Sequence, residues 1–97
     1  MMRVSSHPLA RNELIETAKY YEEIALGLGQ DFIEAFEAAI RSILDNPRAA
    51  PLAGRLTRRK LISRFPYIIY YQILSDELRI LAIAHQSRRP LYWTGRS

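Results

Sequence analysis

Two apolar segments separated by only three polar residues constrain the fold of this chain more than any other feature. Residues 67–74 (Tyr-Ile-Ile-Tyr-Tyr-Gln-Ile-Leu) and 78–85 (Leu-Arg-Ile-Leu-Ala-Ile-Ala-His) are rich in β-branched and aromatic side chains, with Ser-Asp-Glu between them. Such residues favour strands, and so short a polar connection joins strands that run antiparallel. The sequence therefore predicts an antiparallel hairpin. Because both strands are apolar on both faces, we expect cover on each side of the sheet, from the helix pair on one face and from a partner on the other.

Two helices are predicted ahead of this hairpin. Apolar residues recur every three or four positions from Pro8 to Leu28 and again from Gln30 to Asp45, which is the spacing of one helical face. Proline suits the first turn of the first helix, two glycines suit the break between the helices, and Asn46-Pro47 ends the second. Helices joined by so short a turn pack antiparallel.

Shorter strands complete the expected order. Met2–Ser6 is typical of an edge strand, and Arg59–Ser63 is a strand candidate after a loop from Arg48 to Thr57. We therefore expect an α+β fold in the order β-α-α-β-β-β, with an N-terminal helical hairpin packed on one face of a mainly antiparallel three- to four-stranded sheet. A chain of 97 residues supports one apolar core, so a single domain over 1–97 is expected. The predicted core residues are Phe36, Ile40, Ile43, Ile69, Tyr71, Ile80 and Ala82.

Composition excludes several classes of protein. The chain is 48% hydrophobic and 25% charged, which is typical of a globular protein rather than a disordered one. It has no cysteine, so disulfides and thiolate metal sites are excluded. Two distant histidines and a basic half without a carboxylate cluster predict no metal site, and no glycine-rich phosphate loop follows a strand, so no cofactor is expected. No segment has the pattern of a membrane span or signal peptide, so we expect a cytoplasmic protein without membrane contact.

Charge is divided unevenly along the chain. Residues 1–47 contain four basic and eight acidic side chains, whereas residues 48–97 contain ten basic and two acidic ones. This division predicts one cationic surface that attracts an anionic partner, whether a nucleic acid, an acidic protein groove or an acidic peptide. The alternative is that the arginines only keep a small domain in solution.

The most informative segment runs from Arg64 to Arg96. Arg-Phe-Pro-Tyr at 64–67 leads into the aromatic strand, the next strand ends in His85, and Arg-Arg-Pro at 88–90 is followed by Tyr92-Trp93. In this order, and together with the helix pair, these residues resemble ParE-type members of the RelE/ParE toxin family of type II toxin-antitoxin systems. The resemblance covers nearly the whole chain. It implies a toxin that forms a hetero-oligomer with a ParD-like antitoxin.

The family has two functional branches. Ribosome-dependent mRNA endonucleases resembling RelE use a basic cluster, and often a tyrosine, to activate a ribose 2′-hydroxyl and stabilise charge on phosphate. Two positions where such nucleases carry arginines are Ile68 and Gln86 here, so the set is incomplete. This favours the ParE-like branch, whose members bind DNA gyrase and trap its cleavage complex without being enzymes. The nuclease alternative would use Tyr92, His85, Arg64 and Arg88. A third alternative is an inactive module that only pairs with its antitoxin.

Contacts with the two partners follow from the resemblance. In this family the C-terminal segment of the antitoxin, disordered alone, places apolar side chains in grooves and carboxylates against arginines. We predict tight 1:1 pairing with antitoxin contacts at Tyr20, Tyr21, Arg58, Arg59 and Arg88. Contacts with gyrase are expected at Arg89, Trp93 and Arg96. Structural roles remain open for several of these residues, because large aromatics such as Trp93 bury area first and a histidine at a strand end commonly makes structural hydrogen bonds.

Overall fold

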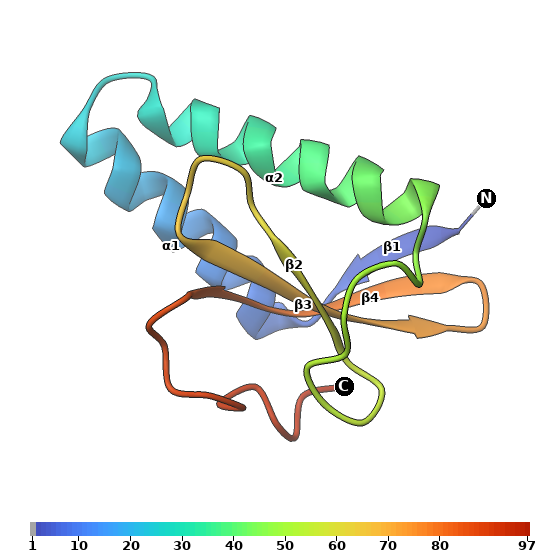
Figure 1. The fold of residues 1–97 in the computed structure, drawn as a ribbon. Coiled ribbons are helices and arrows are strands. Elements are labelled where there is room, and N and C mark those ends of the chain that lie inside the picture. The colour runs from blue at the N-terminus through green and yellow to red at the C-terminus, as the bar shows by residue number, and fades with distance from the viewer. Residues whose placement is uncertain (1) are drawn as a thin grey trace.

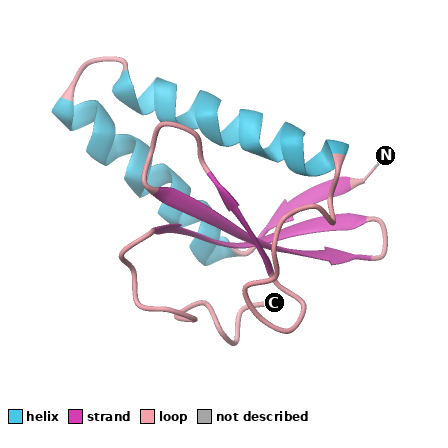
Figure 2. Ribbon diagram, viewed as in Figure 1, coloured by secondary structure: helices cyan, strands magenta, loops and turns pink. Residues whose placement is uncertain are grey.

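The computed structural model describes residues 2–97 and confirms the predicted order of elements. Figures 1 and 2 show the two helices layered on one face of the sheet, with the loop after α2 and the C-terminal segment on the other face. The elements are β1 (Arg3–Ser6), α1 (Pro8–Ile24), α2 (Leu28–Asp45), β2 (Arg58–Leu61), β3 (Tyr67–Leu74) and β4 (Glu77–His85).

The strand order in the sheet is β1-β4-β3-β2. β3 pairs antiparallel with β4, from Tyr67 opposite His85 to Leu74 opposite Glu77, and β2 pairs antiparallel with β3. β1 lies at the edge, as predicted, but runs parallel to β4, so the sheet is mixed. The parallel pairing arises because the chain leaves β1 into the helical hairpin and crosses back over the same face.

The break between the helices comes earlier than predicted. α1 ends at Ile24 and α2 begins at Leu28, instead of at Leu28 and Gln30. Ala25 is extended, with φ −154° and ψ 137°, and Gly27 has φ +87°, a left-handed conformation that favours glycine. A helix cannot continue through either backbone conformation.

A side chain of α1 starts the second helix. The carboxylate of Glu22 accepts hydrogen bonds from the backbone N–H groups of Gly27 (2.9 Å) and Gly29 (3.0 Å), which would otherwise lack partners at a helix N-terminus. Gly29 therefore lies inside α2 and does not end α1. A Cβ atom at Gly29 would lie 2.5 Å from the carbonyl oxygen of Ala18, so glycine permits the close approach of the two helices.

The β3–β4 hairpin differs from expectation in two details. Its turn is Ser75-Asp76, because Glu77 already belongs to β4, and Ser75 has φ +54°. The register shifts between Tyr70 and Tyr71, so that β4 carries one extra residue there, Leu81. Such a bulge allows two consecutive residues to lie toward the same face. β2 also starts and ends earlier than predicted, at Arg58–Leu61 rather than Arg59–Ser63.

The core between sheet and helices, the helix-side core, contains most of the predicted residues. Ile43, Ile69, Tyr71 and Ile80 are at most 2% exposed, which confirms these four predictions. Two predictions were wrong in part, because Phe36 and Ile40 are only partly buried at the edge of this core. Ala82 is fully buried as predicted, but the bulge places it in a cluster on the opposite face. Buried residues of this core that were not predicted are Ala10, Phe32, Ala39, Ile62, Leu78 and Ile83.

A second, smaller cluster lies on the other face of the sheet. Leu81 and Ala82 of β4 pack with Trp93, and Ala53, Tyr70 and Tyr92 lie against them. We call this the second face. The sequence-based expectation that both faces are covered is confirmed, but the cover on the second face comes from the chain itself.

Candidate functional site

The C-terminal segment, residues 86–97, crosses the second face without forming a helix or strand. Trp93 anchors it: the side chain is 6% exposed and its ring centroid lies 5.1 Å from that of Tyr70. Within residues 2–97 its indole N–H has no hydrogen-bond partner. The structure thus places Trp93, one of the predicted gyrase contacts, in a packing position.

Glu13 of α1 holds this segment in place. Its carboxylate accepts hydrogen bonds from the Tyr92 hydroxyl (2.9 Å) and from both terminal nitrogens of Arg96 (2.9 and 3.1 Å). It also accepts one from the backbone N–H of Ile83 (3.0 Å). Bidentate pairing of a guanidinium with a carboxylate is strong and geometrically specific. The C-terminal segment is therefore fixed to α1 by the contacts of Glu13 with Tyr92 and Arg96, which we call the clamp.

The same clamp completes the edge of the sheet. β1 is so short that it pairs with β4 only as far as Ile80. Beyond that point the N–H of Ile83 is bound by Glu13, and the carbonyl oxygen of Leu81 accepts a hydrogen bond from Arg96 (3.0 Å). Unpaired backbone groups at a buried edge are costly. Glu13 and Arg96 thus replace the strand that is missing there.

The clamp fixes the protonation of Tyr92. Burial, then the hydrogen bond and negative charge of Glu13, raise the pKa of the Tyr92 hydroxyl well above its ordinary range. Burial by itself lowers the pKa of Arg96, but the hydrogen bond and charge of Glu13 outweigh it and raise that pKa. The guanidinium carbons of Arg88 and Arg96 lie 4.1 and 4.9 Å from the Tyr92 ring centroid. The phenol is therefore a protonated donor whose ring is in contact with two cations.

The alternative nuclease residues are only partly brought together. Arg88 stacks on Tyr92, but His85 at the end of β4 is engaged locally, since its Nδ1 accepts the N–H of Ser87 at 3.0 Å. Arg64 is exposed in the β2–β3 connection, with φ +75°. No hydrogen bond among residues 2–97 joins His85 or Arg64 to Tyr92.

The predicted antitoxin contacts lie in different environments. Tyr20 is 56% exposed, whereas Tyr21 packs between aromatic rings, with centroids 5.5 Å from Phe32 and 4.9 Å from Phe65. Arg58 donates to the carbonyl oxygens of residues 48 and 50 (3.0 and 2.7 Å) and so fixes the loop after α2. The side chains of Arg59 and Arg88 are exposed. Of the predicted gyrase contacts, Arg89 is exposed and Arg96 is held by Glu13.

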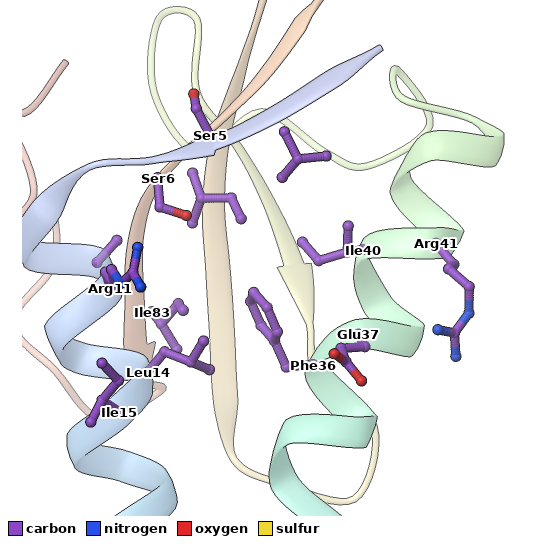
Figure 3. Close-up of a pocket in the computed structure, with 13 residues that line it drawn as sticks. Ser5, Ser6, Arg11, Leu14, Ile15, Phe36, Glu37, Ile40, Arg41 and Ile83 are labelled. Atoms are coloured by element: carbon purple, nitrogen blue, oxygen red, sulfur yellow. The ribbon is translucent and has the colours of Figure 1, made fainter. Parts of the chain in front are cut away.

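A groove that sequence analysis did not predict opens on the helix side. Its volume is about 740 Å³, and it lies between α1 and α2, with β1 and β4 contributing to its base (Figure 3). Leu14, Phe36, Ile40 and Ile83 give it an apolar interior. The partial burial of Phe36 and Ile40 is thus explained, because both line this groove. Its charged lining residues are Arg11, Glu37 and Arg41.

Residues 2–97 contain no group of three or more histidine, aspartate or glutamate side chains placed to hold a metal ion. None of the helices in this range is long and apolar enough to cross a membrane. What the chain offers is an apolar groove on one face and a clamped basic segment on the other.

Comparison with known families gives the class of protein, the toxin half of a toxin–antitoxin pair. The family described as "ParE toxin of type II toxin-antitoxin system, parDE" matches residues 4–90, so the chain belongs to the ParE toxin family. The resemblance inferred from the sequence is confirmed. The match ends before Tyr92, Trp93 and Arg96, so the clamped part of the C-terminal segment lies outside it.

The fold is also similar to a solved structure, described as the chromosomal ParDE TA system from P. aeruginosa. The TM-score is 0.63 at 16% sequence identity, and the alignment covers 88% of this chain and 96% of that one. At this identity the similarity concerns the fold alone. No curated protein matches the sequence.

Proposed function

We propose that this chain is a ParE-type toxin that inhibits DNA gyrase and is neutralised by a ParD-like antitoxin. The observation that carries the choice of target is the state of Tyr92, whose hydroxyl donates to Glu13 and whose pKa is raised. A nuclease tyrosine would have to exchange a proton with substrate near neutral pH. Tyr92 is poorly suited to that, and the positions of the nuclease arginines hold Ile68 and Gln86.

The burial of Ile68 adds to this argument. Its side chain is 6% exposed within the sheet, so that position offers neither charge nor reach toward a phosphate. RNA cleavage needs a cationic clamp on the phosphate as well as an acid and a base. Arg64 and Arg88 alone remain of the expected clamp, and they belong to separate loops. The proposed toxin therefore acts by binding.

The groove between the helices is the proposed site of the antitoxin. Its apolar interior suits a segment that folds on binding and inserts apolar side chains, and Arg11 and Arg41 suit carboxylates flanking them. Tyr20 is exposed on α1 and extends the same helical layer. Antitoxin contacts at Arg59 and Arg88 stay a prediction, and both side chains are exposed and so accessible to a partner.

Two assays with purified toxin test the choice of target. We expect inhibition of gyrase supercoiling with accumulation of cleaved DNA, and no mRNA cleavage in a translation extract. Tyr92→Phe removes the hydroxyl but keeps the ring between Arg88 and Arg96, so the proposal expects gyrase inhibition to persist. Cuts in mRNA that disappear with Tyr92→Phe would establish the nuclease alternative.

The antitoxin site is tested by association kinetics with the partner encoded beside the gene. We expect Arg41→Glu to slow association and flatten its salt dependence, because it reverses charge in the groove. Arg59→Glu together with Arg88→Glu is the comparison, since both residues lie outside the groove. If the second variant slows association more than Arg41→Glu does, the antitoxin binds at the arginines predicted from the sequence rather than in the groove.

A further inference from the structure

Exposed leucines gather on the second face of the sheet. Leu52, Leu56 and Leu91 are 57%, 67% and 53% exposed. Two shallow hollows meet at Leu91 and Trp93: one, of about 390 Å³, includes Leu56, and the other, of about 190 Å³, includes Leu52. Single exposed leucines need no explanation, but three around one point form a patch, and patches mark interaction sites.

The charge around these leucines has one sign. Arg55 lines the first hollow, Arg59 lines the second, and Arg89 is exposed shortly before the third leucine. Residues 46–75 and 78–97 contain no aspartate or glutamate. The one carboxylate that reaches this region from α1 is occupied by Arg96 and Tyr92. The patch is therefore an apolar centre within a cationic border.

We propose that this patch, the leucine–arginine surface, docks an acidic protein surface with apolar pockets and is the part of the toxin that contacts its target. It consists of Leu52, Leu56, Leu91, Arg55, Arg59 and Arg89. Protein interfaces place apolar anchors inside a polar border, and complementary charge speeds encounter. The inference rests on the proposed function, which supplies DNA gyrase as the target. The groove assigned to the antitoxin lies on the opposite side of the sheet.

The apolar centre favours a protein over a nucleic acid. Single-stranded nucleic acids are held by exposed aromatic faces on which bases stack, and duplexes mainly by contacts to phosphates. The aromatic side chains nearest this surface are engaged: Trp93 is buried, Tyr70 packs on it, and the Tyr92 ring contacts the guanidinium groups of Arg88 and Arg96. Leucines contribute nothing to phosphate binding, whereas they fill pockets of a protein partner.

The clamp described above fixes the shape of this surface. Leu91 has φ +60°, a conformation uncommon for leucine, and it lies between Arg88 and Tyr92, which stack on each other. Trp93 fixes the segment from below by packing on β4. Leu91 is thus presented outward by neighbours on both sides. A preorganised anchor loses less entropy on binding than a mobile one.

The test compares three proteins: the wild type, the variant Leu52→Ser/Leu56→Ser/Leu91→Ser, and the control Leu26→Ser/Leu74→Ser. The control removes leucines that are also exposed, at 96% and 42%, but lie elsewhere. Binding to purified gyrase, growth arrest on expression and binding to the antitoxin are measured for each. We expect the triple variant to bind gyrase at least about tenfold more weakly and to lose growth arrest, with antitoxin binding unchanged.

A charge-reversal pair adds a kinetic readout. Arg55→Glu/Arg89→Glu is expected to slow association with gyrase and reduce its salt dependence. Lys19→Glu, which reverses an exposed charge on α1 outside this surface, is expected to have no effect. Binding of the wild type to duplex and single-stranded oligonucleotides is measured in parallel. Tight oligonucleotide binding that the triple leucine variant loses would overturn the proposal in favour of a nucleic acid.

The outcomes separate this inference from the choice of gyrase. If the wild type arrests growth without affecting gyrase and the triple variant does not arrest growth, the surface stands and the target is another protein. If the triple variant still arrests growth, or if it loses the antitoxin instead, the surface is wrong whatever the target. A wild type that neither arrests growth nor binds gyrase overturns both proposals.

Discussion

The two faces of the sheet are covered in different ways. On the helix side, two long helices bury a large core in which Phe32, Ile69, Tyr71 and Leu78 are completely buried. On the second face, the buried cluster consists of Leu81, Ala82 and Trp93, and the cover is a segment without regular structure. Apolar packing over many residues stabilises the first face, whereas the second depends on Trp93 and on one polar clamp at Glu13. Stability of the fold and order of the second face are therefore separable.

The largest expected effect lies in the helix-side core. Phe32 is fully buried, and its ring centroid lies 5.2 Å from Phe65 and 5.4 Å from Tyr67. Phe32→Ala should lower the free energy of unfolding by about 3–5 kcal/mol. Phe36→Ala, at the groove, should cost less because its side chain is only partly buried. Denaturant melts of both variants check this, and equal losses would show that the groove is part of the core.

The next effect tests the clamp. Glu13→Gln removes the negative charge beside Arg96, whose side chain is 12% exposed, and should cost roughly 2–3 kcal/mol. It should also speed hydrogen exchange at the amide of Ile83, because this N–H donates a hydrogen bond to the Glu13 carboxylate in the wild type. Glu16→Gln is the control, because that carboxylate is 72% exposed in its pair with Lys19. Exchange at Ile83 that stays slow in Glu13→Gln would contradict the role of the clamp.

Two glycines, one on each side, sharpen the comparison. In Gly29→Ala the new Cβ would meet the backbone oxygen of Ala18 at 2.5 Å, so the helices must separate, at a cost of about 1–3 kcal/mol. In Gly54→Ala it would meet Cη2 of Trp93 at 3.1 Å, where a side chain has to shift by only a few tenths of an ångström. We expect a loss below about 1 kcal/mol and a change in tryptophan fluorescence. A larger loss in the free energy of unfolding for Gly54→Ala than for Gly29→Ala would contradict the difference between the two faces.

The smallest expected change in the free energy of unfolding at neutral pH is that of Tyr92→Phe. The pKa of Tyr92 is raised in the folded state by burial and by Glu13, while in the unfolded state it is about 10. The stability that this hydroxyl contributes is therefore fully present below about pH 10 and is lost as the pH rises through the folded-state value. Burial also raises the pKa values of Tyr21 and Tyr71, so the comparison is with Tyr92→Phe, which keeps both. The variant should lose less stability between pH 9 and pH 11 than the wild type, as measured by denaturant melts, and parallel curves would contradict this.

Features with a local cause were predictable from the sequence. The strands β3 and β4 follow from β-branched and aromatic residues, and α2 follows from its apolar period. The end of α1 was not predictable in the same way, because the carboxylate of Glu22 caps a helix that begins several residues later. The burial of Ala82 was predicted but its separation from Ile80 was not, because one extra residue in β4 changes which side chains point toward the helices.

The site was less predictable than the fold. Tyr92, Trp93 and Arg96 were identified as functional candidates from the resemblance to the toxin family, but their arrangement depends on Glu13, which lies 83 residues from Arg96 in the sequence. An acidic residue in an amphipathic helix gives no signal of such a partner. The groove has no signal either, because it arises from how the two helices and β1 sit over β4.

The parallel pairing of β1 with β4 has a consequence for synthesis of the protein. Residues 3–6 pair with residues 77–80, so the first strand to leave the ribosome waits for the last one before the sheet is complete. The clamp joins Glu13 to Arg96, which are 83 residues apart in the sequence. Contacts between distant parts of a chain form late in folding. A nascent copy of this protein therefore stays unfinished, and without its second face, until residues 77–96 have been synthesised.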